Sequence, residues 1–153
     1  MAPNMAVETK RLELPPTREG DVLDITPDVQ RAVSSSEIVD GAALIFVTGS
    51  TGSLSTIEYE PGLVEDINAA MERLAPKNAR YGHEERWHDG NGHSHVRATI
   101  MGPDITIPIT GGKLELGTWQ QIVFLELDNK PRNRKITIKL MGLVGARPGG
   151  DEK

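Results

Sequence analysis

The apolar positions of the chain form short alternating or continuous runs, which predict a domain built mainly from β-strands. The segment AALIFV (42–47) is apolar on both faces, so we expect it to be a central strand of a sheet. Further strands are expected at 7–14, 22–26, 53–60 (or an extended loop there), 105–109, 113–116, 119–127 and 135–141. The last two flank the turn-like segment 128–134, which predicts a β-hairpin.

Two segments have the apolar spacing of amphipathic helices. The first begins at Thr26, whose hydroxyl is expected to cap a helix with Pro27 at its first position, and it fades at the serines 34–36. The second begins at Pro61 and ends at Pro76. Its apolar face comprises Leu63, Ile67, Ala70, Met71 and Leu74.

The segment 95–102 fits either a short helix or a strand. With about eight strands and two to three helices, the pattern predicts a single α+β domain over residues 1–153, with a mostly antiparallel sheet. We expect an ordered core at 6–142 and frayed ends, including 146–153.

Composition and charge narrow the class of protein. The chain contains no cysteine, which excludes disulfides, a thiolate nucleophile and cysteine metal ligands. We see no signal peptide and no apolar run as long as a membrane span, so we expect a cytoplasmic protein with no membrane partner. The net charge of −5 and the 4% aromatic content argue against nucleic-acid binding. The basic cluster at 130–135 is interpreted as a solvated turn.

All four histidines lie within one polar segment. His83, His88, His93 and His95 fall in or just after residues 77–93, which are long for an irregular loop in a compact domain. If the chain is extended there, His93 and His95 share a face and can meet one ion together with His83. A hydrophilic loop that uses histidine only for turns is the alternative.

The candidate ligands do not determine which metal ion would bind. Zinc accepts three protein nitrogen or oxygen ligands and a water. Magnesium or manganese prefers more oxygen ligands, for which Asp89, Glu58 and Glu126 are candidates.

Other polar residues suggest contacts of their own. The segment TGSTGS (48–53) offers backbone N–H groups to an anion, or is an ordinary turn. Glu126 lies in an apolar strand and needs a partner, such as Arg132 or Arg134. Trp119 is expected in the core or at an interface.

Several short motifs between residues 40 and 142 occur together in a characteristic order. They are Tyr81-x-His83, Asn91-Gly92-x-Ser94-His95, Gly117-Thr118-Trp119-Gln120, Glu126 and the arginine-rich turn. In this combination the chain resembles the YjbQ-like family, whose members are often labelled secondary thiamine-phosphate synthases. The resemblance implies an α+β fold, a homotrimer, and a site near the subunit boundaries that can hold a metal ion.

The resemblance also implies roles for individual residues. The expected catalytic residues are His83, His95, Asn91, Glu58 and Glu126, and Asp66 matches a further family position. The expected substrate contacts are Ser50, Thr51, Arg97, Arg132 and Arg134. The expected metal ligands are His83, His93 and His95. Gly49 stands where the family usually has a histidine, so His93 is hypothesised to replace it, while His88 has no counterpart.

The implied reaction joins a pyrimidine diphosphate to a thiazole phosphate with loss of diphosphate. A divalent metal would neutralise the phosphates of this small anionic partner. A metal-dependent hydrolase is one alternative, because imidazole ligands suit a metal-bound water. A non-catalytic ligand-binding or structural homotrimer is another, because the family histidine is missing at Gly49.

Overall fold

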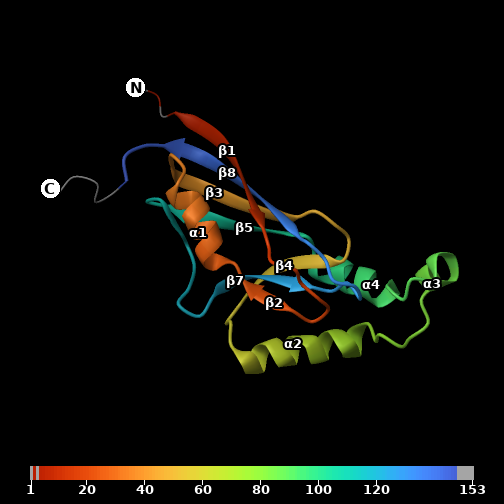
Figure 1. Ribbon diagram of the computed structural model, residues 1–153. Coiled ribbons are helices and arrows are strands. Elements are labelled where there is room, and N and C mark those ends of the chain that lie inside the picture. Colours follow the sequence, from red (N-terminus) through yellow and green to blue (C-terminus); the bar gives the residue numbers. More distant parts are fainter. Residues whose placement is uncertain (1, 3, 148–153) are drawn as a thin grey trace.

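The computed structural model describes residues 2 and 4–147 and confirms the α+β class (Figure 1). The strands are β1 (Met5–Glu13), β2 (Val22–Asp24), β3 (Ile38–Val47), β4 (Gly52–Ile57), β5 (Asp104–Thr110), β6 (Lys113–Leu114), β7 (Gln121–Glu126) and β8 (Lys135–Val144). The helices are α1 (Thr26–Ser34), α2 (Pro61–Leu74), α3 (Gly82–Trp87) and α4 (Gly92–Met101). The described part thus has four helices, not the expected two to three.

The expectations for the two ends of the chain have different outcomes. The frayed tail expected at 146–153 lies, from residue 148 on, outside the described residues. At the start of the core, β1 already begins at Met5. Within the described part, every helix is too short or too polar to span a bilayer.

The strands form two antiparallel sheets. The larger has the order β1-β8-β3-β5-β6, and the smaller has the order β2-β7-β4. The third strand, β3, pairs with β8 on one side and β5 on the other, which confirms the prediction that the apolar run 42–47 belongs to a central strand.

The smaller sheet lies between two apolar layers, which explains why β7 is apolar on both faces. Ile122 and Phe124 point into the main core, which the two sheets share with α1. Val123 and Leu125 point the other way, into a second cluster that Val64 of α2 joins. Figure 1 shows α2 running along the outer side of this sheet. The strand expected at residues 119–127 is confirmed as β7.

The predicted hairpin between β7 and β8 is wrong, because the two strands belong to different sheets. The segment between them is held by other partners. Arg132 and Thr17 exchange backbone hydrogen bonds of 2.9 and 3.0 Å, and Leu14 N donates to Arg134 O at 3.0 Å. These contacts turn the chain away from β7 and lead it into the larger sheet. Apolar spacing alone does not distinguish this crossover from a hairpin.

The predicted starts of the two helices, α1 and α2, agree with the structure to different degrees. The second prediction is confirmed, since α2 begins at Pro61, and Glu60 caps it by accepting hydrogen bonds from the amides of Gly62 and Leu63. The first is wrong in detail, because Thr26 is already part of α1. Its hydroxyl accepts a hydrogen bond from Ile122 N at 2.8 Å instead, which ties the helix to β7.

Two facing glycines allow β3 and β8 to approach closely. Gly41 lies opposite Gly142 in the register of these strands. A Cβ at Gly41 would lie 2.0 Å from the carbonyl oxygen of Met141, and a Cβ at Gly142 would lie 2.0 Å from that of Asp40. Backbone atoms on both sides leave no flexible side chain to move aside.

We predict that Gly41→Ala lowers the free energy of unfolding by about 2–4 kcal/mol, because the central strand pair must separate to admit the methyl group. Urea denaturation followed by circular dichroism measures the loss. Gly82→Ala is the matched control, since a Cβ there meets nothing within 4 Å. An equal effect of the two substitutions would contradict this account of the strand pair.

Candidate functional site

A polar cavity of about 270 Å³ lies where α4 meets the loop before β4 and the segment after β7. Its lining comprises Gly49, Ser50, Thr51, Asp89, Asn91, His95, Asp128, Arg132 and Arg134. Six of these nine are residues to which the family resemblance gave a catalytic or substrate-binding role, and a seventh, Asp89, was a candidate metal ligand. Three segments that are distant in sequence therefore bring most of the predicted polar residues to one place.

Two histidines and a carboxylate converge at the mouth of this cavity. The rings of His83 and His95 lie 4.5 Å apart between centroids, with a tilt of 48°. His83 Nε2 lies 3.3 Å from Asp89 Oδ1. Burial opposes ionisation of Asp89, but hydrogen bonds from the Asn91 amide and from His83 lower the pKa of this carboxyl below its ordinary range. Asp89 is thus held as a carboxylate beside His83, and it lines the same cavity as His95.

Glu84 shapes the loop that carries Asp89. Its two carboxylate oxygens accept hydrogen bonds of 2.6 Å from the amides of Gly90 and Gly92. His88 ends α3 in the left-handed conformation, with φ of 52°. The segment 77–93, expected to be irregular throughout, therefore contains a short helix and an ordered turn.

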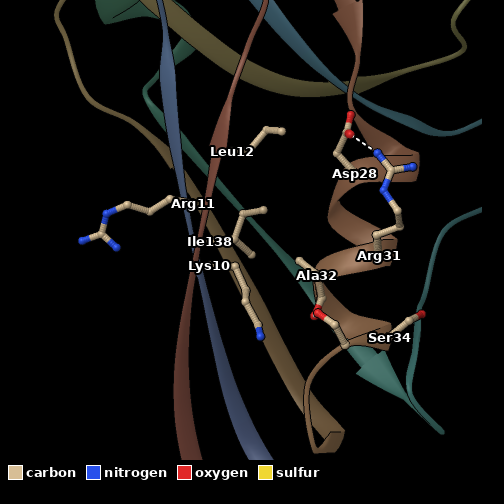
Figure 2. Close-up of a pocket in the computed structure, with 9 residues that line it drawn as sticks. Lys10, Arg11, Leu12, Asp28, Arg31, Ala32, Ser34 and Ile138 are labelled. Atoms are coloured by element: carbon tan, nitrogen blue, oxygen red, sulfur yellow. Dashed lines mark hydrogen bonds and ion pairs between the residues drawn. The ribbon is translucent and has the colours of Figure 1, made fainter.

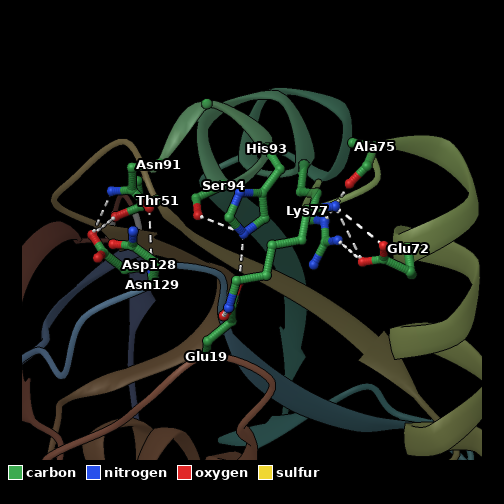
Figure 3. A network of polar contacts seen from close by, with 12 residues as sticks. Glu19, Thr51, Glu72, Ala75, Lys77, Asn91, His93, Ser94, Asp128 and Asn129 are labelled. Carbon is green, nitrogen blue, oxygen red and sulfur yellow. Dashed lines mark hydrogen bonds and ion pairs between the residues drawn. The ribbon is translucent and has the colours of Figure 1, made fainter. Parts of the chain in front are cut away.

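His93 does not join the other two histidines, which corrects the predicted ligand set. Residues 92–101 form α4, and side chains two positions apart on a helix point in different directions, unlike those on the extended chain assumed for the pair. His93 is 1% exposed, and its Nε2 lies 2.5 Å from Glu19 Oε1 (Figure 3). In the described residues, the grouping of donor atoms suited to a metal is His83, Glu84 and Asp89.

Asp128 is the centre of a hydrogen-bond network in the wall of the cavity, and it is not among the residues predicted from the sequence. It accepts hydrogen bonds from the Lys130 amide (2.8 Å), the Thr51 hydroxyl (2.8 Å), Arg132 Nε (2.9 Å) and Asn91 Nδ2 (3.2 Å). Figure 3 shows Thr51, Asn91 and Asp128 together at the start of α4. Burial opposes ionisation, but these hydrogen bonds outweigh it and lower the pKa of Asp128 to about 2. The sequence does contain a feature that could have identified Asp128, since this aspartate directly follows an apolar strand.

Glu126 and Arg134 form a buried ion pair behind this network. Arg134 Nε and Nη2 donate to the two carboxylate oxygens of Glu126 at 2.8 and 2.5 Å. Glu126 is fully buried and does not line the cavity, so the catalytic role expected of it has no access to a ligand. The expectation that it needs an arginine partner is confirmed. The basic cluster at 130–135 is therefore not simply a solvated turn.

Two other predicted residues lie away from the cavity. Arg97 is 7% exposed and ties α4 to α2, because its Nη2 lies 2.6 Å from Glu72 Oε2 and its Nε donates to Ala75 O. Glu58 follows the far end of β4, a strand of six residues that spans roughly 20 Å. Trp119 lies in the loop before β7 and is 73% exposed, so it is not a core residue.

A larger groove of about 630 Å³ lies between β1 and α1, and its lining includes Lys10, Arg11 and Leu12 (Figure 2). The charged residues of α1 that face it, Asp28 and Arg31, are paired with each other. No histidine and no residue with a predicted role lines this groove. Size alone therefore does not identify the site, and the smaller polar cavity carries the reactive side chains.

Comparisons with known proteins agree with the motifs. The model of the family described as UPF0047 protein YjbQ-like matches residues 10–143. A UPF0047 protein of Archaeoglobus fulgidus is 39% identical over 130 residues, covering 85% of this chain and 98% of its own. One from Methanothermobacter thermautotrophicus is also 39% identical, covering 90% and 94%. The crystal structure of a YbjQ-like protein of unknown function from Sulfolobus solfataricus has a TM-score of 0.85 at 35% identity, covering 91% and 99%.

We predict that Asp128→Asn lowers the free energy of unfolding by about 2–3 kcal/mol at pH 7. The substitution removes the charged acceptor of the hydrogen bonds from Thr51, Asn91 and Arg132. The pKa of Asp128 is lower in the folded state than its ordinary value of 3.8. Its stabilisation is therefore complete above pH 5 and disappears as the pH falls from 4 to 2. Urea denaturation at a series of pH values measures the difference between the two proteins. The exposed Asp104→Asn is the control, with an expected change below about 0.5 kcal/mol. A difference between Asp128→Asn and the parent that stays constant down to pH 2 would contradict this role.

Proposed function

Because the chain belongs to the UPF0047 protein YjbQ-like family, and because His83, His95 and Asp89 converge beside an arginine-lined cavity, we propose a metal-assisted enzyme. Its substrate is a small phosphorylated molecule. The observation that carries this proposal is the convergence itself. Imidazole and carboxylate donors from separate turns meet at the mouth of a cavity whose inner wall carries two guanidinium groups.

The donor set fits a divalent cation. Ligand atoms of His83, Glu84 and Asp89 lie within 4.8 Å of one another, and the ring of His95 lies against that of His83. Glu84 already accepts two backbone hydrogen bonds, so we propose that a bound metal takes His95 as its third ligand beside His83 and Asp89. Two imidazoles and one carboxylate suit zinc, which takes three protein ligands and leaves one position open.

The charge balance of the cavity also favours a cation. Around it stand the carboxylates of Asp89, Asp128 and Glu126, against the guanidinium groups of Arg132 and Arg134. With neutral histidines the sum is negative, so the cavity attracts a cation before it attracts a phosphate. A bound divalent ion would reverse that sign and act as a Lewis acid toward a phosphate oxygen.

The polar residues around the cavity have different parts in binding a phosphate. Arg132 is held at Nε by Asp128 and remains 47% exposed at its side chain, so its outer nitrogens are free to bind a phosphate. Arg134 is neutralised by Glu126 and fixes Thr51 through a hydrogen bond of 2.9 Å. Ser50 and Asn91 present polar groups from opposite walls.

Within this class we propose two reactions. In the first, thiamine-phosphate synthesis, the thiazole nitrogen forms a bond to the pyrimidine methylene carbon while the C–O bond to diphosphate breaks. The exposed nitrogens of Arg132 suit the leaving diphosphate. In the second, hydrolysis of a phosphate monoester, water attacks the phosphorus while the P–O bond to the alcohol breaks, which releases phosphate and the alcohol. The imidazole-rich donor set favours this chemistry.

A non-catalytic ligand-binding protein is the alternative function. It is favoured by one observation: the third histidine is absent from the site, because His93 is committed to Glu19 and Gly49 has no side chain. Such a protein would bind the same anion without turning it over.

We also propose that the chain assembles with itself as a homotrimer through the outer face of the larger sheet. Val7 lies opposite Met141, and Met141 opposite Ala42, so their side chains share one face with those of Met5 and Phe46. The four large apolar side chains on this face are exposed: Met5 by 69%, Val7 by 66%, Phe46 by 41% and Met141 by 37%. Met5, Val7 and Met141 adjoin one another, and an exposed apolar group of this kind is typical of a protein interface, while Phe46 lies beyond the Thr9–Lys139 pair on the same face.

We predict that the protein binds Zn²⁺ or Mn²⁺, and that His83→Ala and His95→Ala each weaken the affinity at least about tenfold. Isothermal titration calorimetry measures it directly. His88→Asn is the matched control, because it removes an imidazole from the same segment and asparagine tolerates the left-handed conformation. Undiminished affinity in His95→Ala, or an equal loss in His88→Asn, would rule out this donor set.

The metal-loaded protein is expected to release phosphate or diphosphate. Two assays separate the reactions: one supplies both thiamine precursors and detects thiamine phosphate, and the other supplies phosphate monoesters alone and detects phosphate. Arg132→Gln should raise the KM more than it lowers kcat, because Arg132 binds the phosphate. No product in either assay with any divalent metal would leave the binding protein as the function.

We predict a solution mass about three times the monomer mass of 16.7 kDa, measured by light scattering after size exclusion. Val7→Glu combined with Met141→Glu should give monomers, because charges would be buried on the sheet face. Trp87→Glu is the control, since Trp87 is 64% exposed on α3. A monomeric parent protein, or a trimer that survives the double substitution, would refute the proposed interface.

A further inference from the structure

A second, smaller cavity adjoins the polar one. It has a volume of about 160 Å³, and its lining comprises Gly49, Ser50, Gly52, Ala98, Thr99 and Pro103. Two of these residues, Gly49 and Ser50, also line the polar cavity. The two spaces therefore share one wall, the loop that leads into β4.

The opposite wall is a single face of α4. Asn91 occupies the position before this helix, and His95 follows four positions later. Ala98 and Thr99 come three and four positions after His95. Residues at this spacing lie above one another on a helix. Asn91 and His95 line the polar cavity, and Ala98 and Thr99 line the second one. The two cavities thus follow one another along α4 as one groove.

The two halves of the groove differ in chemistry. The first contains carboxylates, guanidinium groups and an imidazole. The second carries no charged side chain, Ala98 and Pro103 contribute carbon to it, and the Thr99 hydroxyl is engaged with the helix backbone through a hydrogen bond of 2.8 Å to His95 O. A ligand that fills both halves therefore has a charged end and a short apolar end.

Gly49 keeps the shared wall flat. Its φ is +130°, a conformation that residues with side chains rarely adopt. A Cβ there would lie 2.8 Å from Arg134 Nη1, and Arg134 is fixed by the buried Glu126. A side chain at this position would stand where the two halves meet. Glycine in place of the expected histidine thus leaves the passage open.

We propose that this groove selects a phosphate or phosphonate that carries a short aliphatic substituent, with the anionic group in the polar half and the substituent against Ala98, Thr99 and Pro103. Gly49 and Thr99 are then specificity-determining residues. The selection rests on the proposed function, since the anionic group binds at the metal-assisted site.

The test uses alkylphosphonates, whose C–P bond resists hydrolysis. Calorimetry with the Zn²⁺-loaded protein compares methyl-, ethyl- and n-propylphosphonate. Affinity is expected to rise about fourfold for each methylene group, and so by about tenfold or more from methyl to propyl. Thr99→Leu and Ala98→Leu fill the apolar half, so they should abolish this rise while methylphosphonate binds as in the parent protein. Thr99 is exposed, so its substitution is tolerated even where Ala98→Leu does not fold. Val96→Leu is the matched control on another face of α4 and should keep the rise.

The outcomes separate this inference from the proposed function. Methylphosphonate that binds with no gain for propylphosphonate overturns the apolar half alone. An equal gain in the parent protein and in Thr99→Leu does the same. Failure of all three phosphonates to bind, with and without Zn²⁺, overturns both the anion site and the selection built on it.

Discussion

The ion pair between Glu126 and Arg134 joins the two sheets and anchors the hydrogen-bond network of the candidate site. Glu126 ends β7 in the smaller sheet, and Arg134 precedes β8 in the larger one. The pair is almost wholly inaccessible to solvent, so each charge depends on the other. Removing one partner of such a pair typically costs about 3–5 kcal/mol, because the remaining charge stays buried. Thr17 donates a further hydrogen bond of 2.6 Å to Glu126, which fixes the loop after β1 to the same point.

The candidate site is an extension of this ion pair toward solvent. Arg134 fixes Thr51, Thr51 fixes Asp128, and Asp128 in turn orients Arg132 and Asn91. Each step moves outward from the buried centre to the cavity wall. Charged groups held in this way need little reorganisation when a ligand binds, which is the condition for strong electrostatic stabilisation. The same rigid frame explains why Gly49 matters, since Arg134 has no freedom to make room for a side chain there.

Local patterns in the sequence predicted the elements that local physics determines. The helix at Pro61, the central strand at 42–47 and the strand at 119–127 depend on apolar spacing and capping, and all three are confirmed. The hairpin failed because strand pairing across 128–134 depends on tertiary contacts made by Thr17 and Leu14. The pattern also missed α3, whose turn depends on the carboxylate of Glu84 rather than on apolar spacing.

The sequence indicated which types of residue form the candidate site, but not how their side chains are arranged around it. Residues 91, 95, 132 and 134, to which the family resemblance gave roles, line one cavity with the loop at 50–51, and His83 lies against His95. His93 was misplaced because the H-x-H spacing means one thing on a strand and another on a helix, and 95–102 was ambiguous between them. Arg97 and Glu126 carry charges that the fold uses internally, and sequence alone does not separate these from charges offered to a ligand.

The most direct measurement is an anomalous-scattering map from crystals of the Zn²⁺-loaded protein, collected on both sides of the zinc absorption edge. If His83, His95 and Asp89 bind the metal, we expect one peak within about 2.0–2.2 Å of the ring nitrogens of both histidines and of the Asp89 carboxylate. A peak beside His93 and Glu19, or no peak at saturating zinc, would contradict it.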